Sequence, residues 1–165
     1  MNSRRVLFAM AVACMTAVGV ALAGQHGFDM QPCPWCILQR MIFVAIAVVA
    51  LAGSIATSPL ARAFIATLAI LLALAGGAAA VWQHVAAARS TSCQLTLADR
   101  IISATRLDRL LPDAFEPRAS CADAAVDLLG VPFEYWSLAL FVLLVAAATQ
   151  SMAAPSIEIG QTSYS

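Results

Sequence analysis

The chain has 165 residues, of which 62% are hydrophobic and only 11% are charged, and its mean hydropathy is +0.86. A soluble domain carries about 25% charged residues, so this composition argues against a water-exposed globular protein and indicates the lipid bilayer as solvent. The formal net charge is zero and lysine is absent, which excludes a basic nucleic-acid-binding surface. We expect one membrane domain that covers residues 1–165.

Four apolar runs predict four transmembrane helices, since each is close to the ~20 residues that a helix needs to cross the hydrocarbon core. The runs are Val6–Ala23, Ile37–Ile55, Ala63–Trp82 and Tyr135–Met152. Gly76 and Gly77 in the third run suit close packing of helices in lipid. The predicted fold class is an all-α membrane protein, a four-transmembrane-helix bundle with cysteine-bearing loops at about residues 24–36 and 83–134.

The first run also fits a secretory signal peptide. Arg4 and Arg5 precede the apolar stretch, and Ala21-Leu22-Ala23 has the small residues of a cleavage site. The run is long for a signal peptide, however, and the next run begins soon after it. We therefore expect a helix that is retained.

The arginines leave the orientation in the membrane open. An even number of spans places both termini on one side, and Arg4, Arg5 and Arg62 favour that side as cytoplasmic. The opposite loop carries Arg89, Arg100, Arg106, Arg109 and Arg118. The charge rule alone cannot decide between the two orientations.

The long loop is too rich in leucine and isoleucine for a disordered linker. Apolar residues recur at near-helical spacing between Leu97 and Phe115, which predicts an amphipathic segment in the membrane interface. Ser120 followed by Asp123 is typical of a helix start, and we expect a short helix from there to Gly130.

Four cysteines lie outside the apolar runs. Cys33 and Cys36 form a CxxC motif between the first two runs, Cys93 and Cys121 lie in the long loop, and Cys14 lies within the first run. With four spans both pairs fall on the same side of the membrane and can meet. They could form structural disulfides, a zinc site, or a pathway that exchanges electrons between the pairs.

The spacing favours electron exchange. Zinc sites usually take thiolates from two tight Cys-x₂₋₄-Cys turns, whereas Cys93 and Cys121 are far apart in the chain, so we expect no metal. A CxxC disulfide closes a small, strained loop that stabilises little, and its common use is redox chemistry. A membrane scaffold whose loops are joined by disulfides is the alternative.

The residues around the CxxC motif strengthen the redox interpretation. Pro34 fits the first turn of a helix, where Cys36 would meet unpaired N–H groups that favour a thiolate. Arg40 follows one turn later on the same face, and a guanidinium just inside the bilayer is a functional candidate. Arg40 could stabilise the thiolate or bind a polar headgroup, or it could simply extend to the interface. The chain lacks motifs for haem, dinucleotides or iron–sulfur clusters, so a lipid-soluble quinone is the expected electron acceptor.

One segment resembles the CxxCxxxR motif of the bacterial disulfide bond formation protein B (DsbB) family: Pro32-Cys33-Pro34-Trp35-Cys36-Ile37-Leu38-Gln39-Arg40. Further similarity lies at Gln83-His84, at Cys93, and from Cys121-Ala122-Asp123 to Trp136. It extends from about Gly24 to Phe141, in the order of the four spans.

The resemblance implies a bundle in the bacterial inner membrane, with both termini cytoplasmic and the cysteine loops periplasmic. It implies that the protein re-oxidises a DsbA-like periplasmic thiol oxidase and passes the electrons to ubiquinone or menaquinone. By the same resemblance Cys93 pairs with Cys121 and Cys33 pairs with Cys36. The implied catalytic residues are Cys33, Cys36, Cys93 and Cys121, and the implied quinone-binding residues are Arg40 and His84.

Two residues depart from the family pattern. Gln39 leaves Arg40 without an adjacent carboxylate, and Cys14 matches no catalytic position. A vitamin K epoxide reductase-like quinone reductase is a related alternative, but there we would expect the loop cysteines to precede the CxxC motif.

Overall fold

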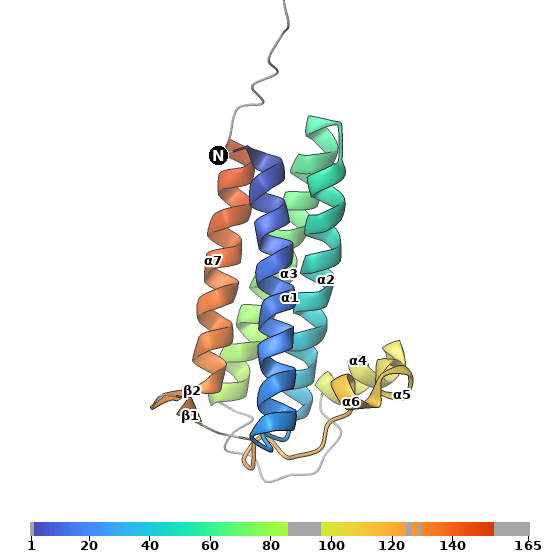
Figure 1. The fold of residues 1–165 in the computed structure, drawn as a ribbon, viewed down its shortest axis with the longest axis vertical. Helices are drawn as coiled ribbons and strands as arrows, with labels where there is room; N and C mark the ends of the chain where they lie inside the picture. Colours follow the sequence, from blue (N-terminus) through green and yellow to red (C-terminus); the bar gives the residue numbers. More distant parts are fainter. Residues whose placement is uncertain (1, 86–96, 125–126, 129, 154–165) are drawn as a thin grey trace, which may run out of the picture.

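The computed structural model describes residues 2–85, 97–124, 127–128 and 130–153. Four long helices run side by side (Figure 1). They are α1 (Ser3–Gly27), α2 (Pro34–Ile55), α3 (Pro59–Val85) and α7 (Phe133–Ala153). Each is long and apolar enough to cross a membrane. The predicted all-α bundle of four transmembrane helices is confirmed, and the protein is a multi-pass membrane protein.

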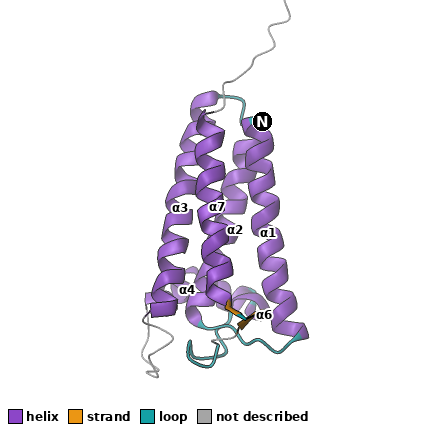
Figure 2. Ribbon diagram, turned by 90° about the vertical axis from the view of Figure 1, so that its left-hand side faces the viewer, coloured by secondary structure: helices purple, strands orange, loops and turns teal. Residues whose placement is uncertain are grey.

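The helices alternate in direction, so the end of α1, the start of α2, the end of α3 and the start of α7 lie together (Figure 2). We call this the cysteine end, because Cys33 and Cys36 lie there. At the opposite end the Ser3 hydroxyl donates to the carbonyl of Ser151 at 2.7 Å, which ties the start of α1 to the end of α7. The helices extend beyond the predicted apolar runs, since a helix continues into the polar headgroup region where its backbone bonds are still satisfied internally.

Small residues allow α3 to approach its neighbours closely. Its buried residues are Ala66, Ala69, Ala73, Gly76, Ala79, Ala80 and Gln83. The ring of Phe141 from α7 fills the space above Gly76 and stacks on Phe43 of α2, with centroids 4.3 Å apart and planes 5° apart. The two rings and the glycine thus join three helices at mid-bundle.

Gly76→Ala is expected to destabilise the protein by about 1–3 kcal/mol, the usual cost of overpacking a core. A Cβ at this position would lie 2.2 Å from the Phe141 ring, so the ring must move. Unfolding in detergent micelles would measure the loss. Gly19→Ala is the matched control, because a Cβ there meets no atom within 4 Å. Equal stability of the two variants would contradict this account of the α3–α7 contact.

The amphipathic segment of the long loop is present, but as three short helices rather than one. They are α4 (Leu97–Thr105), α5 (Leu107–Leu110) and α6 (Pro112–Phe115). Arg106 has a left-handed backbone, with φ of 57°, which interrupts the helical path, and a new helix then starts at Pro112. Ile102 and Phe115 pack on Ile37 of α2, so the segment lies against the cysteine end of the bundle (Figure 1).

The predicted helix from Ser120 to Gly130 is wrong. The Ser120 hydroxyl does accept the backbone N–H of Asp123 at 3.2 Å, but only a turn follows in the described residues. The chain then forms a small antiparallel hairpin of β1 (Asp127–Leu128) and β2 (Val131–Pro132). Gly130, with φ of +76°, supplies the backbone conformation that the turn requires, and α7 begins directly after the hairpin.

Candidate active site

The CxxC motif lies at the N-terminus of α2, as the sequence predicts. Cys33 is the N-cap residue with an extended backbone, and Pro34 begins the helix. The Cys33 sulfur accepts the backbone N–H of Cys36 at 3.4 Å, and the two sulfurs lie 3.0 Å apart. The motif therefore lies at the positive end of the α2 helix dipole, an environment that favours a thiolate.

A third cysteine, Cys121, lies against this pair. The backbone N–H groups of Arg118 and Ala119 donate to the carbonyl of Pro32, at 3.0 and 3.3 Å, and hold the long loop beside the CxxC motif. The side chains of Cys33 and Cys121 form a hydrogen bond, and both are free thiols. The predicted catalytic cysteines Cys33, Cys36 and Cys121 thus meet, whereas Cys93 lies outside the described residues.

The hydrogen bond between Cys33 and Cys121 shifts the pKa values of the two thiols in opposite directions. Hydrogen bonding to Cys121, together with hydrogen bonding to Cys36 and burial, raises the pKa of the Cys33 thiol far above its ordinary value. Acceptance of the same bond lowers the pKa of Cys121. Cys121 is therefore prepared to act as a thiolate, and Cys33 retains its proton.

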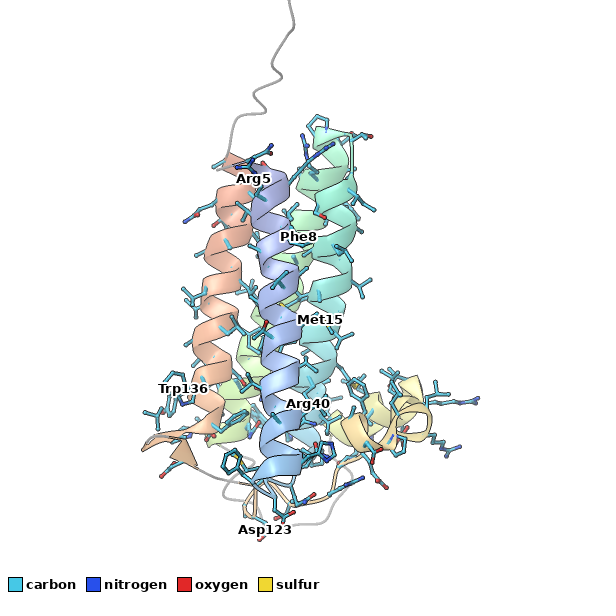
Figure 3. The ribbon with its side chains drawn as sticks, in the orientation of Figure 1. Arg5, Phe8, Met15, Arg40, Asp123 and Trp136 are labelled. Atoms are coloured by element: carbon cyan, nitrogen blue, oxygen red, sulfur yellow. The ribbon has the colours of Figure 1, made fainter. Side chains whose placement is uncertain are left out.

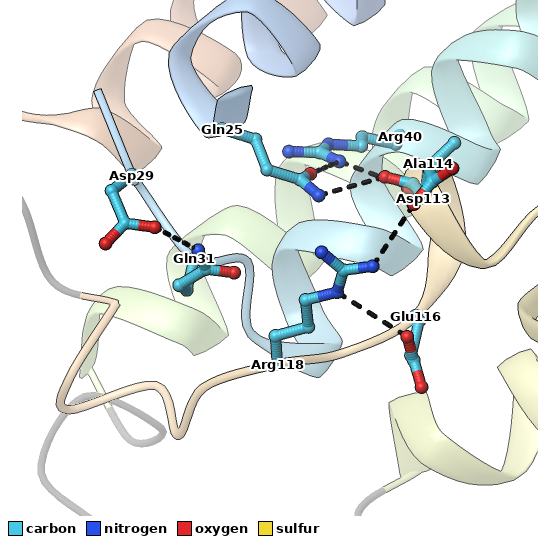
Figure 4. A network of polar contacts seen from close by, with 8 residues as sticks. All are labelled: Gln25, Asp29, Gln31, Arg40, Asp113, Ala114, Glu116 and Arg118. Carbon is cyan, nitrogen blue, oxygen red and sulfur yellow. Dashed lines mark hydrogen bonds and ion pairs between the residues drawn. The ribbon is translucent and has the colours of Figure 1, made fainter. Parts of the chain in front are cut away.

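Arg40 is buried and held by protein groups. Its guanidinium donates to the Gln25 side-chain oxygen at 2.7 Å, to the carbonyl of Ala114 at 3.1 Å, and to the carbonyl of Ala21 at 3.3 Å. The Gln25 amide in turn donates to the carbonyl of Asp113 at 2.9 Å (Figure 4). The residue is only 7% exposed. It ties α2 to α1 and to the α6 segment.

A pair of hydrogen-bonded glutamines lies beside the CxxC motif. Their contact with it was not predicted from the sequence. The amide of Gln83 on α3 donates to the Cys36 sulfur at 3.3 Å. The amide of Gln39 donates to the Gln83 oxygen at 2.7 Å and so orients the group. An N–H donor at 3.3 Å favours a thiolate on Cys36 over a thiol. Helical spacing alone gave no signal for this contact, because it depends on how α3 packs on α2.

A cavity of about 790 Å³ opens beside these residues. Cys36, Gln39 and Arg40 line it from α2, and Gln83 lines it from α3. The rest of the wall is largely apolar and includes Ala17, Val20, Phe43, Trp136 and Leu140. Arg40 and Trp136 both lie toward the cysteine end, far from Arg5 (Figure 3). A few polar groups in an apolar wall of this volume are typical of a site for a small apolar ligand.

His84 is not among the described residues that line the cavity, but it lies one hydrogen bond away. Its Nδ1 is 2.8 Å from the Glu134 carboxylate, and Glu134 does line the cavity. The Tyr135 hydroxyl is 3.1 Å from Nε2 of the same ring. The place of Glu134 in the cavity wall was not predicted, since a single acidic residue at the start of an apolar run was its only signal in the sequence.

These features define a class of protein: a four-helix membrane protein with cysteines clustered beside a cavity at one end of the bundle. The model of the family described as "Disulfide bond formation protein DsbB" matches residues 3–150. The chain belongs to the DsbB family and is a membrane protein-disulfide oxidoreductase.

Individual relatives are similar over most of their length. The chain is 34% identical over 144 residues to disulfide bond formation protein B of Herminiimonas arsenicoxydans, which covers 87% of this chain and 90% of that protein. It is 34% identical to disulfide bond formation protein B 1 of Pseudomonas syringae pv. syringae, over 86% of this chain and 85% of that protein. It is 31% identical to disulfide bond formation protein B of Burkholderia pseudomallei strain K96243, over 92% and 90%.

Proposed function

We propose that this protein re-oxidises a DsbA-type thiol oxidase and passes the two electrons to a membrane quinone. The observation that carries the proposal is a cluster of three cysteines, one of which, Cys36, lines a largely apolar cavity together with Arg40. A quinone supplies a two-electron acceptor that dissolves in lipid. The cavity suits it, because the wall is apolar and Arg40 and Gln83 offer N–H donors for a carbonyl oxygen.

The cysteines would act in the order Cys93, Cys121, Cys33, Cys36. A thiolate of the DsbA-type partner attacks Cys93 in a Cys93–Cys121 disulfide, forms a mixed disulfide and releases Cys121. The second thiol of the partner then displaces Cys93, and the partner leaves oxidised. Cys121 attacks Cys33 in a Cys33–Cys36 disulfide, which forms a Cys33–Cys121 bond and releases Cys36 as a thiolate. The lowered pKa of Cys121 and its bond to Cys33 support this direction of attack.

Cys36 would deliver the electrons. Gln83 and the start of α2 stabilise its thiolate, and the cavity places it against the acceptor. Cys93 would then attack Cys121 in the Cys33–Cys121 bond, which restores the Cys93–Cys121 disulfide and releases Cys33 as a thiol. The Cys33 thiol and the Cys36 thiolate would close the Cys33–Cys36 disulfide as their two electrons pass to the quinone. His84, one hydrogen bond from the cavity through Glu134, would act on the headgroup indirectly.

We place the protein in the bacterial inner membrane, with both termini in the cytoplasm and the cysteine end at the periplasm. Arg4 and Arg62 lie at the opposite end from Cys33, which agrees with a cytoplasmic location for that end. A DsbA-type partner is periplasmic, so only this orientation lets the partner reach the cysteine loops.

Thiol trapping tests the proposal against a scaffold whose disulfides never turn over. Purified protein in detergent is mixed with reduced DsbA, with or without a short-chain ubiquinone or menaquinone, and free thiols are alkylated. We expect the loop cysteines to become reduced without quinone and oxidised again with the quinone that the protein uses. Cys33→Ser should accumulate a mixed disulfide between DsbA and Cys93. Cysteines that stay oxidised under all conditions would support the scaffold and contradict the proposed redox function. A mixed disulfide of DsbA with Cys121 instead of Cys93 would reverse the assigned order of the two cysteines.

A further inference from the structure

Glu134 is the buried carboxyl of the cavity. It is only 6% exposed and lies in the first turn of α7. Among the described residues, the other carboxyls that line the cavity are those of Asp29 and Asp123, and both residues are exposed. The side chain of Gln31 donates to Asp29, and the Ser120 hydroxyl donates to Asp123. Glu134 is therefore the acidic group that is shielded from water and faces the space where a ligand would bind.

A chain of hydrogen bonds connects Glu134 to the surface. The carboxylate is 2.8 Å from Nδ1 of His84, and the Tyr135 hydroxyl is 3.1 Å from Nε2. The side chain of His84 is 41% exposed, so water can reach the ring. An imidazole that contacts a carboxylate through one nitrogen and a hydroxyl through the other, and that water can reach, can take up a proton and pass it on. Cavity and surface are thus joined by two titratable groups.

The reduction itself requires a proton from the protein. Cys36 is released from its disulfide as a thiolate and carries no proton, so the Cys33 thiol supplies only one of the two protons that a quinol carries. The second must be delivered inside an apolar cavity. In this chain Gln39, which cannot donate an acidic proton, precedes Arg40, and its amide is committed to Gln83.

Resting on the quinone reduction proposed above, we propose that Glu134 donates this second proton and that His84 replenishes it. Cys36 thiolate, Cys33 thiol, protonated Glu134 and quinone become the Cys33–Cys36 disulfide, ionised Glu134 and quinol. Two electrons pass from the sulfurs to the quinone, one proton comes from Cys33 and one from Glu134. His84 in its imidazolium form then returns a proton to Glu134 and recovers its own from water. The start of α7 stabilises the carboxylate that is left.

Stopped-flow reduction of a short-chain ubiquinone by the pre-reduced protein tests the role. Glu134→Gln keeps the size of the side chain but removes the acid, so we expect kcat to fall about a hundredfold, the low end of general-acid catalysis, with little change in KM for quinone. The rate of the variant should rise as the pH falls, since solvent protons replace the lost donor, and its solvent isotope effect should change. His84→Gln should lower kcat less. Glu116→Gln is the matched control: Glu116 is exposed, and its carboxylate lies 3.5 Å from Arg118.

Infrared difference spectra of the quinone-free protein give a readout that does not depend on turnover. Between spectra recorded at different pH values we expect a difference band from the Glu134 carboxyl, because a proton that His84 takes up can pass to it. Glu134→Gln should remove this band and His84→Gln should shift it. The groups that face the pair are Asp29, Cys36, Arg40, Arg118, Asp123 and Tyr135. These groups are the same in the wild type and in both variants, so differences between the spectra come from Glu134 and His84.

The outcomes separate this inference from the proposed function. If the wild type does not reduce the quinone, the proposed function fails. If the wild type reduces it and Glu134→Gln matches the wild type in kcat, pH profile and isotope effect, only the proton donor is wrong. A rise in KM alone, or a spectrum without a band that depends on Glu134, would make the contact a structural tie between α3 and α7 and overturn the proposal. If Glu134→Gln does not fold, the same measurements on His84→Gln test the proposal, because the His84 side chain is half-exposed and its replacement disturbs the fold less.

Discussion

Cys36→Ser is expected to reduce quinone reduction to the rate of the protein-free reaction. Among the described cysteines, Cys36 alone lines the cavity, and its sulfur receives the N–H donor of Gln83. A serine hydroxyl does not ionise at neutral pH and cannot form a disulfide, so the electrons of Cys33 and Cys121 have no route to the acceptor. Absorbance of the quinone, followed with reduced DsbA as donor, measures the loss.

Two further variants locate that loss. Cys14→Ala removes a cysteine that is fully buried among the core residues of α1, and this small change should cost less than about 1.5 kcal/mol and leave turnover within about twofold. Cys121→Ser should block oxidation of DsbA, because Cys93 loses its disulfide partner. It should still allow a reduced Cys33–Cys36 pair to be oxidised by quinone. Quinone reduction by Cys36→Ser at the rate of Cys14→Ala would remove Cys36 from the pathway.

The architecture followed from hydropathy because the bilayer imposes it. A run of about 20 apolar residues has few alternatives to a spanning helix, and all four runs became α1, α2, α3 and α7. The loop was harder. The predicted hydrogen bond between Ser120 and Asp123 does form. A capping bond, however, fixes only the residues next to it. The path of the chain beyond it depends on long-range bonds from Arg118 and Ala119 to Pro32.

The site was predictable within one helix and not between helices. Cys33, Cys36 and Arg40 lie within eight residues of α2 and its cap, so helical register was enough to place them on one face. Gln25, Gln83 and Glu134 come from three other helices. Their contacts depend on how those helices are rotated against α2, and a bundle with nearly uniform apolar surfaces gives little sign of that rotation in its sequence. Polar residues near the ends of apolar runs were the only available signal.

Arg40→Lys is expected to raise the KM for quinone roughly ten- to a hundredfold, which corresponds to about 1.5–3 kcal/mol for a hydrogen bond to a charged group. A guanidinium has five N–H donors in a plane. The three bonds to Gln25, Ala114 and Ala21 fix that plane at the cavity wall and leave donors for a quinone oxygen. A lysine carries the charge, but as a point on a flexible stem, and cannot bridge α1 and the α6 segment in the same way. Arg40→Ala also leaves the side-chain oxygen of Gln25 without its donor, and it should raise the KM for quinone further.

The effect should be confined to the quinone side. Exchange with DsbA takes place in the long loop, so the KM for DsbA in Arg40→Lys should stay near that of the wild type when the two substrates are varied separately. Arg62→Lys is the matched control, since Arg62 lies in the first turn of α3 at the opposite end of the bundle. If Arg40→Lys raised both KM values equally, or lowered the stability of the fold without a preference for quinone, Arg40 would be a structural tie between helices. A selective change in KM for quinone would instead assign the remaining donors of its guanidinium to the electron acceptor.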